Sequence, residues 1–122
     1  MIDISPEQTI YNRLYDLCTN LGYDVYEYIP NEVEYPLVIL GEQFSQNVRV
    51  HKDFYNKDTQ ITIHVWHNNW RRRGTLLEMM RQIELAIVRE FDVDGELITS
   101  QVIGEPDNAE LLHGSSETNI RI

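Results

Sequence analysis

Histidine is the first residue type to test for chemistry in this 122-residue chain, which contains His51, His64, His67 and His113. His64 and His67 stand three apart at the end of a stretch that alternates apolar and polar residues. In an extended strand that spacing places two side chains on opposite faces, so a shared metal ion would be awkward to hold. No dense Cys/His cluster accompanies the pair, and we expect no metal site.

Nucleophilic catalysis has little support in the sequence. The single cysteine, Cys18, lies on the apolar side of a predicted helix, where we expect a buried and unreactive thiol. No serine stands in a Gly-x-Ser-x-Gly elbow, and the six glycines are scattered rather than gathered into a phosphate-binding loop. Asp92 and Asp94 are followed by apolar residues where a calcium loop needs ligands. We expect no catalysis and no cofactor.

The most unusual stretch is Trp66–Gly74, where Arg71, Arg72 and Arg73 follow Trp70 directly. The run precedes a predicted helix, and a cation near a helix N-terminus costs up to about 1 kcal/mol through the helix dipole. Stability alone would favour acidic residues there. Arginine and tryptophan are enriched at the energetic centres of protein interfaces, so Trp70–Arg73 is a candidate interface, with a plain exposed loop as the alternative.

The charge of the chain is negative overall and unevenly distributed. Ten Lys and Arg stand against twenty Asp and Glu, giving a net charge of −10. Residues 1–45 carry eight acids and one base, residues 49–89 four acids and eight bases, and residues 90–122 eight acids and one base. The total argues against direct binding of nucleic acid or an anionic membrane. The segregation would suit contacts between copies, a basic middle meeting an acidic flank, unless folding mixes the charges.

Two amphipathic helices are predicted to position these residues. Ser5, Pro6 and Gln8 are typical of a capped helix start, and Gly22 of a left-handed stop, so we expect a helix over 5–21. Thr75 and Glu78 have the spacing of a second capping box, which predicts a helix over 75–91. The apolar stripe of the second helix is Leu76, Met80, Ile83 and Ile87, widened by Leu77, Met79, Ala86 and Phe91.

Strands are predicted over 23–30, 35–45, 59–67 and 97–105, with a short last strand at 118–122. Residues 46–58 are polar and are interpreted as a long hairpin arm or a mobile loop, and residues 106–117 as a loop. The element order is α-β-β-β-α-β-β. It predicts a single α+β domain over 1–122, in which two helices cover one face of a mainly antiparallel sheet of four or five strands.

The arrangement resembles the small tail-completion proteins of long-tailed bacteriophages, also called tail terminators or tail-to-head joining proteins. The likeness spans nearly the whole chain. It rests on the N-terminal amphipathic helix, "YPLVIL" at 35–40, "HVW" at 64–66, the helix at 75–91, a strand with a Gly turn and a last segment "LLHGSSETNIRI". The arginine run is not part of the family pattern, so its role does not come with the resemblance.

The resemblance implies a subunit of a homo-oligomeric ring, usually a hexamer, at the head-proximal end of the tail tube in the virion. Such a ring stops tube growth and joins the tail to the head. Its partners would be its own copies, the major tail tube protein and the head-tail connector, with no catalysis and no cofactor. The arm at 46–58 suits a segment that orders on assembly, with Phe54 and Tyr55 as anchors, or is simply a flexible hairpin tip.

Other functions stay open from the residues alone. A connector or minor head protein of the same assembly would look similar. A small acidic binding or inhibitor protein would present carboxylates to a basic host target, and a small hydrolase is the weakest alternative because no catalytic constellation is visible. The N-terminus MIDISPEQ lacks the features of a signal peptide, and the longest unbroken aliphatic runs, Leu37–Leu40 and Leu85–Val88, are four residues. We therefore expect assembly in the host cytoplasm and no membrane partner.

Overall fold

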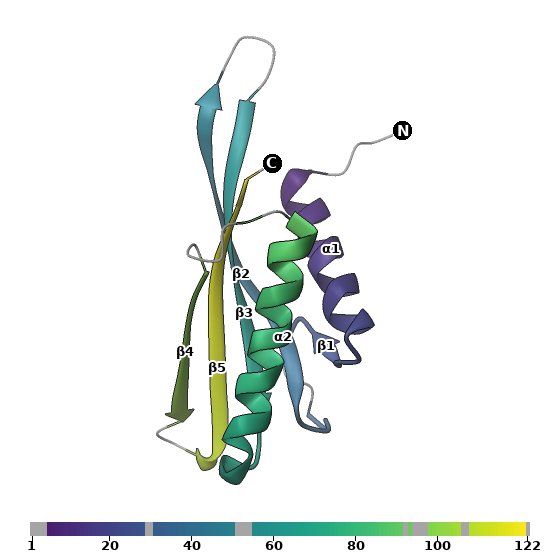
Figure 1. Ribbon diagram of the computed structural model, residues 1–122, viewed down its shortest axis with the longest axis vertical. Coiled ribbons are helices and arrows are strands. Elements are labelled where there is room, and N and C mark those ends of the chain that lie inside the picture. Colours follow the sequence, from purple (N-terminus) through teal and green to yellow (C-terminus); the bar gives the residue numbers. More distant parts are fainter. Residues whose placement is uncertain are drawn as a thin grey trace.

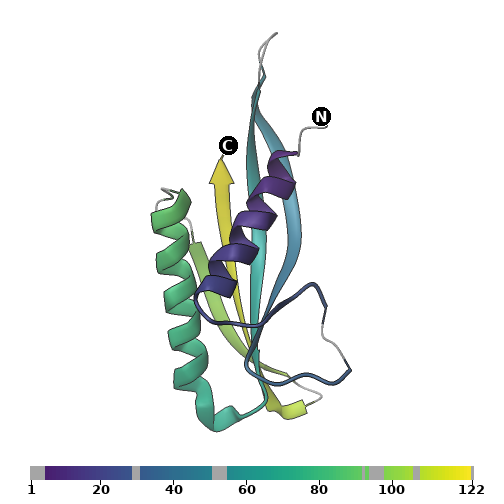
Figure 2. The ribbon, with the colours of Figure 1, turned by 90° about the vertical axis from the view of Figure 1, so that its right-hand side faces the viewer.

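The chain forms a five-stranded sheet with two helices on one of its faces, as a computed structural model shows (Figures 1 and 2). The structure describes residues 5–28, 31–50, 55–91, 93, 98–105 and 108–121. The elements are α1 (Pro6–Asn20), β1 (Val25–Tyr26), β2 (Leu37–Val50), β3 (Tyr55–His67), a 3-10 turn η1 (Trp70–Arg72), α2 (Arg73–Phe91), β4 (Ile98–Glu105) and β5 (Asn108–Arg121). The predicted α+β class and element order are confirmed.

The strand order in the sheet is β1-β2-β3-β5-β4, and only the β1–β2 pair is parallel. β2 and β3 form a long hairpin whose paired residues run from Leu37↔Trp66 to Val50↔Tyr55. β5 pairs with β3 only as far as Asp58↔Arg121, so the end of the hairpin extends beyond the rest of the sheet (Figure 1). The hairpin-arm interpretation of residues 46–58 therefore holds for the described parts, 46–50 and 55–58, which are strand.

Local capping explains why α1 begins and ends where predicted. Ser5 Oγ accepts a hydrogen bond from the backbone N–H of Gln8 at 3.2 Å. The Gln8 side-chain amide donates along the helix to Asn12 Oδ1. At the other end Gly22 takes φ +94°, and hydrogen bonds from Gly22 N to Thr19 O and from Tyr23 N to Cys18 O form a Schellman motif.

The predicted start of the second helix is wrong by two residues. α2 begins at Arg73, not at a Thr75 cap, and η1 leads directly into it. Glu78 does not complete a capping box; its carboxylate accepts hydrogen bonds from Arg81 Nε at 3.0 Å and Arg81 Nη2 at 2.8 Å. The helix starts earlier because Asn69 caps the 3-10 turn that precedes it. Arg71 and Arg72 therefore lie in that turn, and Arg73 is the first residue of α2.

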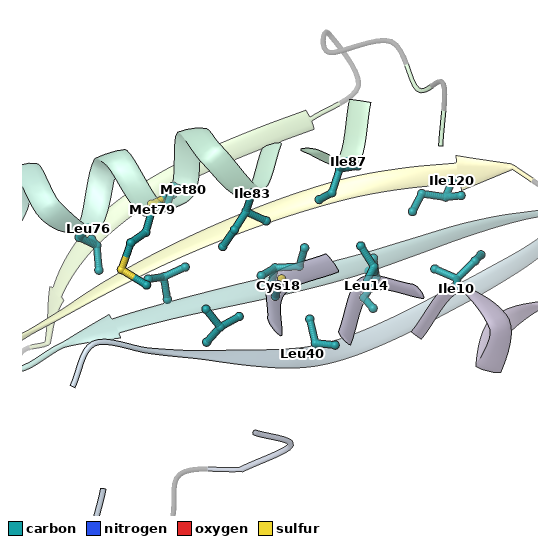
Figure 3. Packing of buried hydrophobic residues seen from close by; sticks show 14 of the residues in the cluster. Ile10, Leu14, Cys18, Leu40, Leu76, Met79, Met80, Ile83, Ile87 and Ile120 are labelled. Carbon is teal, nitrogen blue, oxygen red and sulfur yellow. The ribbon is translucent and has the colours of Figure 1, made fainter. Parts of the chain in front are cut away.

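The core lies between the helices and the sheet (Figure 3). Its buried members come from α1, α2 and the helix-facing sides of the three central strands: Ile10, Leu14, Cys18, Val38, Leu40, Ile61, Ile63, Val65, Leu76, Met79, Met80, Ile83, Ile87, Leu112 and Ile120. The predicted stripe of α2 is confirmed, except that Leu77 is exposed. Among the described residues, no helix combines the length and apolar character needed to cross a bilayer.

The prediction of a loop over 106–117 is wrong, because residues 108–121 form β5 between β3 and β4. Its helix-facing side carries the small residues Gly114 and Ser116 where α2 approaches closely. A Cβ on Gly114 would lie 2.4 Å from Met80 Sδ, and Ser116 Oγ donates to Glu84 Oε1 at 3.1 Å. Small and polar residues thus fit the packing of α2 at positions that, in the sequence, are typical of a loop.

Cys18 is expected to resist thiol reagents in the folded protein. Its side chain is fully buried in the core, and burial raises the pKa of the thiol to about 12, so almost no thiolate is present near neutral pH. Labelling with an aromatic disulfide at pH 8 should be slow in buffer and rapid in urea. Fast stoichiometric labelling without denaturant would contradict this burial.

Candidate functional site

The predicted interface at Trp70–Arg73, called the cationic turn below, lies at the end of β3 where the chain enters α2. A short series of hydrogen bonds holds it. The backbone N–H of Asn69 donates to Nδ1 of His67 at 3.2 Å, and the side-chain Oδ1 of Asn69 accepts from the N–H of Arg71 at 3.0 Å. Asn69 O also accepts from Arg72 N at 2.9 Å. The backbone that carries the exposed arginines is therefore held in place through Asn69 and the buried His67.

The side chains of the cationic turn are exposed. Trp70 is 57% exposed, and η1 contains no buried residue. The guanidinium carbon of Arg71 lies 5.3 Å from the centre of the Trp70 ring, a cation–π distance. Within the described part of the chain, no carboxylate forms an ion pair with Arg71, Arg72 or Arg73, and the first turn of α2 has no acidic residue. Three cations thus stand at the positive end of a helix dipole without an ion pair to any described carboxylate.

The structure does not bring all six predicted interface residues together. Tyr55 is the first residue of β3, at the projecting end of the hairpin, and Phe54 lies outside the described residues. Figure 1 shows that end of the hairpin at the top of the molecule and the start of α2 at the bottom. The cationic turn and the hairpin end are therefore two separate surfaces at opposite ends of the sheet.

Lowering the pH below about 6.5 is expected to destabilise the protein through His67. Burial, and secondarily the positive charge of Arg72, lowers the pKa of His67 from its usual value of 6.5. The unfolded chain therefore binds the proton more readily, so the contribution of His67 is complete above pH 6.5 and is lost as the pH falls toward the folded pKa. Urea unfolding between pH 7.5 and 5.5 measures this effect.

The matched variant for that measurement is His67→Asn, which keeps an acceptor close to the Nδ1 position and does not titrate. Its free energy of unfolding should depend less on pH than that of the wild type over the same range. Equal pH dependence in the two proteins would show that the protonation of His67 does not contribute.

A second polar cluster lies on the face of the sheet opposite the helices. His64 Nδ1 is 2.6 Å from His113 Nε2, and His64 Nε2 is 3.2 Å from Glu42 Oε2. His113 stacks on Trp66 with ring centres 3.9 Å apart and planes 6° apart. Trp66 Nε1 is buried without a hydrogen-bond acceptor within the described part of the chain. The row Glu42–His64–His113–Trp66 crosses β2, β3 and β5.

Proton positions in this row follow from the donor and acceptor chemistry. A hydrogen bond from its own backbone, and then one from His64, lowers the pKa of Glu42, so its carboxylate is ionised and accepts. A neutral His64 that donates from Nε2 to this carboxylate has Nδ1 as an acceptor for His113 Nε2–H. The row is a hydrogen-bonded series of polar side chains that ends at the stacked rings of His113 and Trp66.

Sequence reasoning missed this row because it treated His113 as a loop residue. The alternation of residues 59–67 already placed His64 and Trp66 on one face, and β5 brings His113 beside both. Gly41 is a further signal: a Cβ there would lie 2.7 Å from His64 Cδ2 and Nε2, so the glycine makes room for the imidazole. The predicted pair His64 and His67 does lie on opposite faces, since His64 faces the row and His67 faces the helices.

No group of three or more His, Cys, Asp or Glu side chains within the described ranges is arranged to hold a metal ion. A scan against models of protein families gave no match, and a search of curated proteins gave no significant match.

Proposed function

We propose that this chain is a structural assembly protein whose copies form a homo-oligomeric ring, and that the ring is a tail terminator of a long-tailed phage. The ring would sit on the end of the tail tube, stop its growth and join the tail to the head connector. The phage assignment comes from the resemblance of the sequence pattern, and self-assembly is supported by the surface of the folded chain.

The observation that carries the proposal is the cationic turn. Its three arginines lie at the start of α2 without a described carboxylate to neutralise them, so we expect the helix dipole to make them unfavourable in the isolated chain. Trp70 adds an aromatic ring that is 57% exposed. An acidic partner surface would compensate both costs, and the chain itself carries acidic flanks on either side of its basic middle.

The edges of the sheet also suit a ring. β4 forms one edge, and at the other edge β1 pairs only with Val38 and Ile39, which leaves β2 from Gly41 to Val50 without a described neighbour on that side. An exposed strand edge presents unpaired backbone N–H and C=O groups to other chains, and monomeric proteins usually protect such edges. Two unlike edges suit head-to-tail contacts, which close into a ring when the rotation between successive copies permits it.

Replacing the three arginines, Arg71→Ser/Arg72→Ser/Arg73→Ser, is expected to abolish ring formation and tail joining while slightly raising the stability of the subunit. The gain in stability, up to about 1 kcal/mol per cation removed, follows from the helix dipole. Light scattering gives the assembled mass, microscopy with tail tubes gives joining, and urea unfolding gives stability.

The matched control removes two exposed arginines further along the same helix, Arg81→Ser/Arg89→Ser, and should assemble like the wild type. Unaltered assembly and joining in the triple variant would remove the cationic turn from the interface. A wild-type chain that stays monomeric and forms a one-to-one complex with a basic host protein would instead support the acidic-inhibitor alternative.

A further inference from the structure

An open groove lined by tyrosines runs between α1 and β1. Tyr11 and Tyr15 from α1 face Tyr26 and Tyr28 from the β1 segment across a volume of about 640 Å³. Four of the seven tyrosines of the chain meet there, and Tyr28 and Tyr15 are 74% and 42% exposed. We call this surface, together with Glu27, the tyrosine groove.

The tyrosine groove is acidic as well as aromatic. Glu27 lines it and accepts a hydrogen bond from the Tyr11 hydroxyl at 3.1 Å. Residues 5–36, which include α1 and β1, carry six carboxylates and one base. That base, Arg13, is occupied by Glu90 at 2.9 Å. Negative charge repels phosphates and nucleic acid, whereas tyrosine faces next to carboxylates are a favourable environment for guanidinium groups.

The cationic turn has the complementary chemistry. It presents three arginines and an exposed tryptophan, and within the described part of the chain the arginines form no ion pair. It lies away from the tyrosine groove of its own chain. The elements that line the groove, α1 and β1, lie at the right-hand side of Figure 1, while α2 begins at the lower end of the molecule.

We propose that the cationic turn of one copy docks into the tyrosine groove of the next copy, with guanidinium groups stacked on tyrosine rings and paired with Glu27. This contact rests on the proposed self-assembly and names the two surfaces that would carry it. Because the two surfaces differ and sit at different places on the chain, each copy offers one of each. The contact is therefore head-to-tail and propagates from copy to copy until a ring closes.

Mixing two variants tests this pairing. The first is the arginine variant Arg71→Ser/Arg72→Ser/Arg73→Ser, which keeps an intact groove. The second is Glu27→Lys/Tyr28→Ser, which keeps an intact cationic turn and alters only exposed side chains. Sedimentation should find each variant alone as a monomer at concentrations where the wild type assembles. An equimolar mixture should double the mass to a one-to-one heterodimer, because one competent contact is restored. Glu34→Lys, with the same charge change outside the groove, should assemble as the wild type does.

The outcomes separate the pairing from the proposed function. If the wild type assembles and the groove variant assembles equally well, the pairing is wrong and the ring can stand. If both variants are monomers alone and remain monomers when mixed, the two surfaces are not each other's partners, although assembly itself is upheld. A wild-type protein that is monomeric alone and in the presence of tail tubes would contradict both the pairing and the proposed ring. The tyrosine groove would then bind a cationic partner that is not a second copy of this chain.

Discussion

Replacing Ile83 with alanine is expected to lower the free energy of unfolding by about 2–5 kcal/mol. Ile83 lies in the middle of α2, is 1% exposed and points into the core between the helix and the sheet (Figure 3). Removing its outer methyl groups leaves a cavity that the surrounding side chains refill only in part. Domains of this size have about 5–15 kcal/mol of stability, so the loss is large. Urea unfolding followed by tryptophan fluorescence measures it.

Leu85→Ala is the matched control, because Leu85 lies two residues further along the same helix and is 39% exposed. Its loss should change the free energy of unfolding far less, by about 0.5 kcal/mol. Equal losses at the two positions would mean that α2 does not pack on the sheet through the Ile83 side of the helix.

Replacing Gly114 with valine is expected to lower the free energy of unfolding by about 1–3 kcal/mol, because it forces extra atoms into a filled core. A Cβ at this position would lie 2.4 Å from Met80 Sδ and 3.3 Å from Leu76 Cδ2. The Met80 and Leu76 side chains of α2, which are both buried, would have to shift within the core. Calorimetry of the purified variant gives the stability change.

Gly104→Val supplies the comparison, since Gly104 lies on the neighbouring strand β4 and a Cβ there meets no atom within 4 Å. Valine favours strand conformation, so this variant should be neutral or slightly more stable. If Gly114→Val were as harmless as Gly104→Val, the expected crowding by the Met80 and Leu76 side chains would be wrong.

Elements specified by neighbouring residues were predicted well from the sequence. The start of α1 depends on Ser5 and Gln8, its end depends on Gly22, and the apolar spacing of α2 lies within one helix. β5 could not be recognised in this way. Its inward residues are Gly114, which makes room for Met80, and Ser116, which bonds to Glu84, so residue types typical of a loop were selected by a helix distant in the sequence.

The candidate surfaces show the same difference between features set by neighbouring residues and features set by contacts distant in the sequence. The cationic turn could be predicted from the sequence, because the arginines are consecutive and directly precede a predicted helix. The tyrosine groove depends on α1 and β1 lying side by side, and the row from Glu42 to Trp66 depends on β5 lying next to β3. The capping box predicted at Thr75 does not form, because hydrogen bonds of Asn69 with His67 and Arg71 fix the turn earlier in the chain and the helix begins before Thr75.

The mass of the purified wild-type chain over a range of concentrations tests the central claim, that the protein acts by assembling with its own copies. The account predicts a discrete oligomer, about 86 kDa for six copies of a 14.4 kDa chain, that falls apart when the three arginines of the cationic turn are replaced. A mass of 14.4 kDa at every concentration, and equally in the presence of tail tubes, would contradict it.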